Sequence, residues 1–201
     1  MSAEVKAADV AALRKMTGAG MMDCKEALAE ADGDMDRAAE LIRVKMGSKV
    51  GKLADREAAE GTVQSYIHGA GRVGVMVQVD CNTDFVAKND DFIEFAREVA
   101  MHIAASPAVQ YVTDEDVPEE AREAEARIFA EQVADKPEEI RPKIVDGMLD
   151  KWLGEVVLLR QPHVNADRYD GRTIEELRAE LSAKTGENVV IRRFVRYAVG
   201  E

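Results

Sequence analysis

Apolar residues recur at helical spacing through the first 46 residues, where they fall into three short segments. The first two, residues 5–16 and 21–31, are separated by the glycine-containing stretch 17–20, which ends the first helix. The third, residues 34–45, begins at Asp34, whose side chain suits the N-cap of a helix. Because three short helices form only a small core, this region is predicted to be a compact appendage rather than an enzyme domain.

The period of the pattern changes further along the chain. Apolar and polar residues alternate over 62–67 and over 73–79, on either side of Gly69-Ala70-Gly71, which predicts a β-hairpin. A third alternating run covers residues 189–199 and predicts another strand. Helical stripes lie between these strands, the first over residues 92–103 and the last opened by a capping-box sequence at Thr173.

Two heavily charged helices are predicted at 118–135 and 143–159, joined by a short segment, and together they resemble a protruding helical pair. The patterns therefore predict an α+β protein. Residues 1–46 form its three-helix domain, and residues 47–60 are a linker with some helix. A core over 61–201 contains a three-stranded sheet, other helices and the helical hairpin at about 118–159.

Charge narrows the possible partners. The 201 residues include 27 Lys and Arg against 39 Asp and Glu, a net charge of −12, and residues 113–139 alone carry 11 acids and three bases. Such a chain is poorly suited to hold nucleic acid or an anionic membrane surface, since both require cationic contacts. No run approaches the ~20 apolar residues that cross a bilayer, and the sequence MSAEVKAADV lacks the features of a secretory signal. We therefore expect a cytoplasmic protein.

Candidate catalytic and metal-binding motifs are weak. Cys24 and Cys81 match neither a disulfide framework nor a metal-binding motif, so no metal or cofactor is expected. The string Gly69-x-Gly71-x-x-Gly74 fits a dinucleotide-binding fingerprint, but a strand follows it where that fingerprint needs a helix. No signature of a nucleophile with its base occurs. An enzyme that uses the glycine-rich hairpin remains the third-ranked hypothesis.

Two segments are not explained by the needs of folding. Met21 and Met22 are adjacent in a predicted helix, so a small domain is expected to bury one and expose the other, although both could belong to the core. Phe85 and Val86 stand in a polar segment after a strand, as the apolar tip of what is predicted to be a loop or the start of a helix. An aromatic residue there either folds back into the core or projects into a partner. Both alternatives stay open on this evidence.

The sequences of these segments, TGAGMMDCKEAL at 17–28 and CNTDFVAKND at 81–90, resemble two signature stretches of the bacterial elongation factor Ts family. The resemblance continues through LGEVVLLRQPHV and GENVVIRRFVRYAVG, so it covers nearly the whole chain in order. It implies a ubiquitin-associated-like three-helix domain over 1–46, and a core with antiparallel strands and a protruding helical pair. Arg141-Pro142 departs from the family pattern, and a proline costs a helix interior ~3 kcal/mol.

The length of the chain allows one copy of the family's core unit, as in the short members, which pair as dimers. Some short members carry a cysteine in the last strand, where this chain has Phe194-Val195-Arg196. That difference excludes an interchain disulfide there, so the expected homodimer is non-covalent.

The resemblance implies that the chain is a guanine-nucleotide exchange factor in translation elongation. Its partner would be elongation factor Tu, in the GDP-bound and nucleotide-free states. The element implied to intrude into the partner comprises Thr83, Asp84, Phe85 and Val86. Its phenylalanine would wedge between two helices of the GTPase domain, and the resulting shift would remove Mg²⁺ from the nucleotide site.

A second implied contact with the GTPase domain comprises Met21, Met22 and Lys25. His68, with the hairpin around residues 69–74, matches a segment that faces another domain of elongation factor Tu. The chain would then be no enzyme and would need no cofactor. The alternative is a non-catalytic binding and dimerisation module with a different partner.

Overall fold

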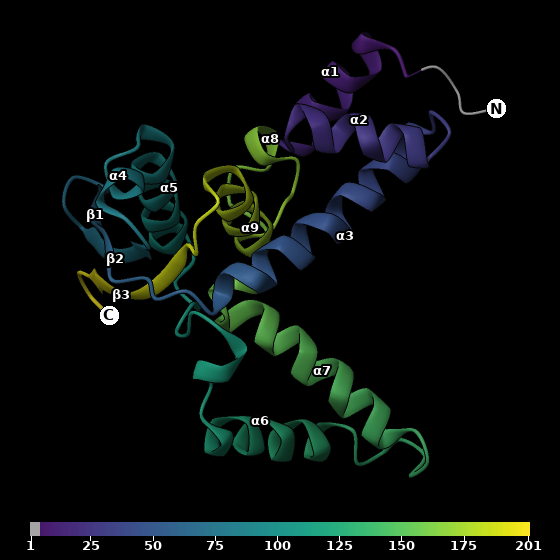
Figure 1. The fold of residues 1–201 in the computed structure, drawn as a ribbon. Coiled ribbons are helices and arrows are strands. Elements are labelled where there is room, and N and C mark those ends of the chain that lie inside the picture. The colour runs from purple at the N-terminus through teal and green to yellow at the C-terminus, as the bar shows by residue number, and fades with distance from the viewer. Residues whose placement is uncertain (1–4) are drawn as a thin grey trace. The chain divides into compact units, whose positions relative to one another are not determined.

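The computed structural model describes residues 5–201, and its elements alternate between helical and extended regions (Figure 1). The helices are α1 (Ala7–Thr17), α2 (Met21–Glu30), α3 (Met35–Ala54), α4 (Asp84–Ala87), α5 (Asp90–Ala105), α6 (Glu119–Gln132), α7 (Arg141–Val156), α8 (Ala166–Tyr169) and α9 (Ile174–Thr185). The strands are β1 (Glu60–His68), β2 (Val73–Cys81) and β3 (Val190–Ala198). The chain is therefore an α+β protein, as its sequence pattern predicts. No helix in the described part is long and apolar enough to cross a membrane.

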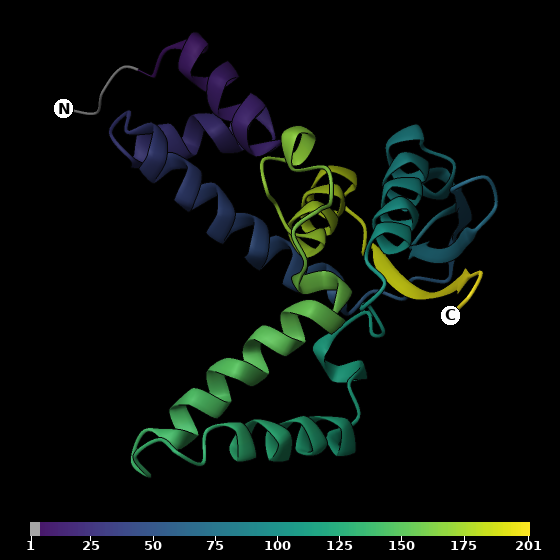
Figure 2. The same cartoon turned by 180° about the vertical axis from the view of Figure 1, so that it is seen from behind.

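The first three helices pack against one another, and they lie together in both views (Figures 1 and 2). Their buried residues are Val10, Leu13, Ala19, Cys24, Ala27, Leu28, Ala38 and Ile42. The Asp34 side chain accepts a hydrogen bond from the backbone N–H of Arg37 at 2.9 Å, so the predicted N-cap is confirmed. Residues 1–4 of the predicted domain lie outside the described residues. Helix α3 continues to Ala54, so the first part of the predicted linker is helical.

The three strands form an antiparallel sheet in the order β1-β2-β3, which leaves β2 in the middle. The predicted hairpin is confirmed. Gly69, Ala70 and Gly71 all have positive φ angles, so these glycines serve the turn that reverses the chain. The alternation of the sequence explains the burial of β2, because Val75 and Val77 are buried while Met76 between them is exposed.

The two predicted charged helices are α6 and α7, which pack together with the chain reversing between them (Figure 2). A small apolar cluster supports the pair, with Val117, Leu153 and Val156 buried. Pro142 lies in the first turn of α7, where the missing N–H leaves no intrahelical hydrogen bond unmade. The departure from the family pattern therefore falls at a position that tolerates proline.

The contacts divide the chain into two compact units. One holds residues up to Val63 with Gln78–Ala96 and Glu176–Val190, and the other holds Gln64–Val77, Arg97–Glu175 and Ile191–Glu201. The residues implied by the resemblance at positions 21–25 and 83–86 belong to the first unit, and His68 belongs to the second.

Two histidines are buried in the second unit, with their rings 5.5 Å apart. His102 Nε2 lies 2.8 Å from Gln161 Oε1, and His102 Nδ1 accepts from the backbone N–H of Val164. His163 Nδ1 accepts from the N–H of Asn165. Burial is the main reason why the pKa of each histidine is lowered, and it favours neutral rings. His102 is thus a structural histidine in this fold.

Candidate protein-binding site

A one-turn helix carries the exposed Phe85. Strand β2 ends at the buried Cys81, and α4 follows after two residues, with the Thr83 hydroxyl accepting from the backbone N–H of Val86 as its N-cap. The side chain of Phe85 is 82% exposed, although a phenylalanine is among the residues most often buried. We call residues 82–88 the Phe85 turn. Of the two predicted tip residues, only Phe85 projects, since Val86 is half-buried.

The charges of the Phe85 turn are paired on its surface. Lys88 Nζ lies 2.6 Å from Asp84 Oδ2, and the two residues are one helical turn apart. The hydrogen bond from Lys88, together with its charge, lowers the pKa of Asp84. The same pair raises the pKa of Lys88. Asp84 is therefore ionised beside Phe85, and its exposure leaves the pair open to screening by salt.

Polar contacts fix the inner side of the Phe85 turn to the segment between α9 and β3. Glu187 accepts hydrogen bonds from the backbone N–H groups of Asn82 and Thr83 and from the Thr83 hydroxyl. The Asn82 side chain accepts from the N–H of Asn188 and donates to the carbonyl of Glu57. No local pattern in the sequence indicates these contacts, because Glu187 and Asn188 lie 104 to 106 positions from their partners and Glu57 lies 25 positions from Asn82. The only signal is the polar run Gly186-Glu187-Asn188 after the last predicted helix.

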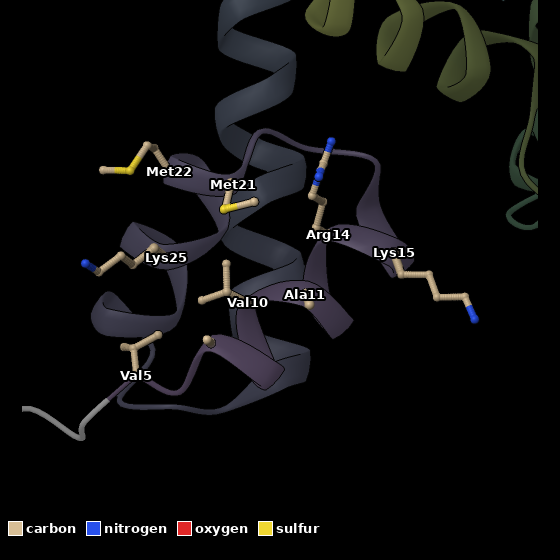
Figure 3. Close-up of a pocket in the computed structure, with 9 residues that line it drawn as sticks. Val5, Val10, Ala11, Arg14, Lys15, Met21, Met22 and Lys25 are labelled. Atoms are coloured by element: carbon tan, nitrogen blue, oxygen red, sulfur yellow. The ribbon is translucent and has the colours of Figure 1, made fainter.

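A second surface is a groove of about 630 Å³ between α1 and α2 (Figure 3). We call it the methionine groove. The described residues that line it are Val5, Ala7, Val10, Ala11, Arg14, Lys15, Met21, Met22 and Lys25. In Figure 3, Met21 lies over Val10, and Lys25 and Lys15 extend from opposite sides. The charged groups among these residues are all cationic, in a chain of net charge −12.

Both methionines of this groove are exposed, Met21 at 60% and Met22 at 66%. The expectation that one of them would be buried is therefore wrong. The reason is the register of α2, in which Cys24, Ala27 and Leu28 occupy the face that packs on the other helices. Flexible thioether side chains adapt readily to an irregular apolar surface, so the groove is suited to bind protein.

The remaining candidate, His68, ends β1 in the second unit and is exposed. Its Nδ1 lies 3.1 Å from the hydroxyl of Tyr66, and the two rings stack with their centroids 5.9 Å apart. Within residues 5–201, no group of three or more His, Cys, Asp or Glu side chains is arranged to hold a metal ion.

An exposed aromatic side chain on an anchored turn and an apolar groove with cationic residues are features of a protein that acts by binding another protein. Residues 2–170 match the family model described as Elongation factor TS. The chain is 50% identical over 201 residues to Elongation factor Ts of Trichodesmium erythraeum, with 99% of this chain and 90% of that protein covered. It is 49% identical over 199 residues to Elongation factor Ts of Moorella thermoacetica, with coverage of 98% and 96%. The chain belongs to the elongation factor Ts family.

Proposed function

We propose that the chain is the guanine-nucleotide exchange factor of elongation factor Tu in translation elongation, and that it acts by binding rather than by covalent catalysis. The observation that carries the proposal is the exposure of Phe85 on a turn whose backbone is hydrogen-bonded to Glu187. Membership of the family supports the choice of partner. A phenylalanine side chain that is 82% exposed offers a large apolar area, and burial of that area in a partner would stabilise the complex strongly.

The proposed step is insertion of Phe85 between helices of the GTPase domain, with Thr83, Asp84 and Val86 completing the contact. The shift of those helices displaces Mg²⁺, which neutralises the phosphates of bound GDP. An exchange factor of this kind binds the empty GTPase more tightly than the GDP-bound one. Linkage then requires that the chain weaken GDP binding by the same factor.

The methionine groove would supply a second, separate contact with the GTPase domain through Met21, Met22 and Lys25. Its apolar floor and cationic residues fit an apolar partner surface that also carries acidic groups. This contact would hold the complex together while Phe85 acts, so binding and exchange can be separated by mutation. His68 and the hairpin turn would face a different domain of the partner.

A non-covalent homodimer is also proposed. The strands of the sheet expose large apolar side chains in the second unit, namely Ile67, Met76, Val195 and Tyr197. A second copy would remove such surface from water. Both cysteines are buried, which is consistent with a dimer that is not held by a disulfide.

Stopped-flow release of a fluorescent GDP from elongation factor Tu tests the proposed function. Addition of the chain is expected to increase the release rate with increasing concentration until it saturates. Direct titration of fluorescent GDP against the chain alone is the control, and no binding is expected. An unchanged release rate despite complex formation would favour the non-catalytic binding module, and direct nucleotide binding would favour an enzyme.

A further inference from the structure

The carboxylate of Glu187 accepts hydrogen bonds from the backbone of the Phe85 turn. Glu187 Oε2 accepts from the N–H of Asn82 at 3.0 Å and from the N–H of Thr83 at 3.1 Å. Glu187 Oε1 accepts from the Thr83 hydroxyl at 2.6 Å. Hydrogen bonds to a charged acceptor are about twice as strong as neutral ones. Three donors therefore converge on one side chain directly before the helix that presents Phe85.

The turn has little intrinsic stability. Helix α4 has only four residues, and a helix of one turn does not form on its own in water. The Cys81 thiol donates to the carbonyl of Thr83 at 3.2 Å, so Thr83 is held at its carbonyl as well as at its N–H and hydroxyl groups. The orientation of Phe85 therefore depends on how residues 82–83 are held, and its own side chain makes few contacts because it is 82% exposed.

Glu187 is itself held in place by the end of α9. Gly186 has a φ of +72°, and its N–H donates to the carbonyl of Ser182 at 2.8 Å, which ends the helix. The N–H of Glu187 donates to the Thr185 hydroxyl at 3.4 Å. The chain therefore leaves α9 in a defined direction, with the Glu187 side chain half-buried beneath the Phe85 turn.

The same segment also holds the end of α3. The Asn188 side chain donates to the carbonyls of Ala54 at 3.2 Å and of Arg56 at 3.0 Å. The Arg56 guanidinium donates to the carbonyl of Gly186 at 3.2 Å. Residues 186–188 thus contact both the end of the long helix from the N-terminal region and the turn that carries Phe85.

We propose that Glu187 is the positioning residue of the exchange reaction, which fixes the Phe85 turn in the orientation that enters the GTPase. This inference rests on the proposed function, because it assigns Glu187 an effect that acts only through Phe85. It predicts that the pre-formed turn, and not contact of Glu187 with the partner, sets the exchange rate. An ordered turn lowers the entropic loss on insertion.

Two substitutions separate the hydrogen bonds from the charge. Glu187→Ala leaves the two N–H groups without their acceptor, so the turn loses its anchor. Glu187→Gln restores an oxygen at the position of Oε2, and its amide group can donate to the Thr83 hydroxyl. We expect Glu187→Ala to lower stimulated GDP release about tenfold and Glu187→Gln to keep it within about threefold of the unchanged chain. Glu131→Ala, an exposed acid on α6, is the matched control.

A double-mutant cycle with Phe85→Ala provides the decisive readout. If Glu187 acts by positioning Phe85, Glu187→Ala should change the release rate by less than about twofold once Phe85 is absent. Additive effects of the two substitutions would overturn the inference, since they would show that Glu187 acts on stability or on the partner independently. Circular dichroism melting of each variant shows whether the fold persists.

Hydrogen exchange of the backbone amides tests the anchor without the partner. The N–H groups of Asn82 and Thr83 are expected to exchange faster in Glu187→Ala, while those of α5 keep their protection. Unchanged exchange at Asn82 and Thr83 would contradict the inference. If the proposed function itself were wrong, the results would differ. Phe85→Ala would then leave GDP release unaffected, while Glu187→Ala would still increase amide exchange at Asn82 and Thr83.

Discussion

Replacement of Phe85 by alanine separates binding energy from folding energy. A phenylalanine that is 82% exposed contributes little to the fold, so the free energy of unfolding should change by less than about 0.5 kcal/mol. If the partner buries that exposed part, roughly 160 Å² leaves water, which corresponds to about 4 kcal/mol at about 25 cal/mol per Å². This value of about 4 kcal/mol is an upper bound. Since each 1.4 kcal/mol corresponds to about tenfold in rate, we expect stimulated GDP release to fall at least about tenfold.

The assay is stopped-flow release of fluorescent GDP from elongation factor Tu, with circular dichroism melting of the same preparations. Val44→Ala is the matched control, since Val44 is a 72% exposed apolar residue on α3 outside the methionine groove. Raising the Mg²⁺ concentration should enlarge the defect of Phe85→Ala if displacement of the ion is the step that Phe85 drives. A normal release rate with an intact fold would refute the wedge, and a large loss of melting temperature would assign Phe85 to the core.

Three further predictions concern the groove, the sheet and the buried histidines. Met22→Asp should weaken binding to elongation factor Tu in a calorimetric titration while the melting temperature stays nearly unchanged. A loss of stability as large as the loss of binding free energy would show that Met22 belongs to the core. Sedimentation equilibrium at micromolar concentration should show a dimer, and a monomer throughout would contradict the proposal. Since burial lowers the pKa of His102 and His163 in the folded state, the unfolded chain binds more protons near pH 6.5. The histidines should therefore not reduce the free energy of unfolding above about pH 7.5, and that free energy should decrease as the pH falls through about 6.5. A urea midpoint that does not change between about pH 7.5 and about pH 5.5 would contradict this prediction.

Elements with a complete local signal could be predicted from the sequence. The N-cap at Asp34 has a side chain that bonds within three residues of itself, and the hairpin turn at 69–71 has glycines at positions with positive φ. The extent of α3 is less clear from the sequence, which predicts a linker with some helix after residue 46, because Gly47 and Gly51 lower helix propensity. In the structure Val50 and Leu53 are buried, so packing extends the helix through both glycines.

The site was only partly accessible from the sequence. The polar surroundings of Phe85 fit both a buried and a projecting ring, and the choice depends on tertiary contacts that no local pattern contains. Glu187 could not be found because its partners at residues 82–83 lie 104 and 105 positions away. The exposure of Met21 and Met22 could not be predicted because which residues of α2 face the core, here Cys24, Ala27 and Leu28, becomes clear only when the packing of the helix is known.

The affinity of the chain for the two states of elongation factor Tu tests the central claim most directly. Isothermal titration calorimetry should be performed with the nucleotide-free protein and with the protein saturated with GDP and Mg²⁺. An exchange factor must bind the nucleotide-free state more tightly, by at least about tenfold, and by the same factor by which it weakens GDP binding. Equal affinities for the two states would contradict the account, because a ligand that binds both states equally shifts neither equilibrium.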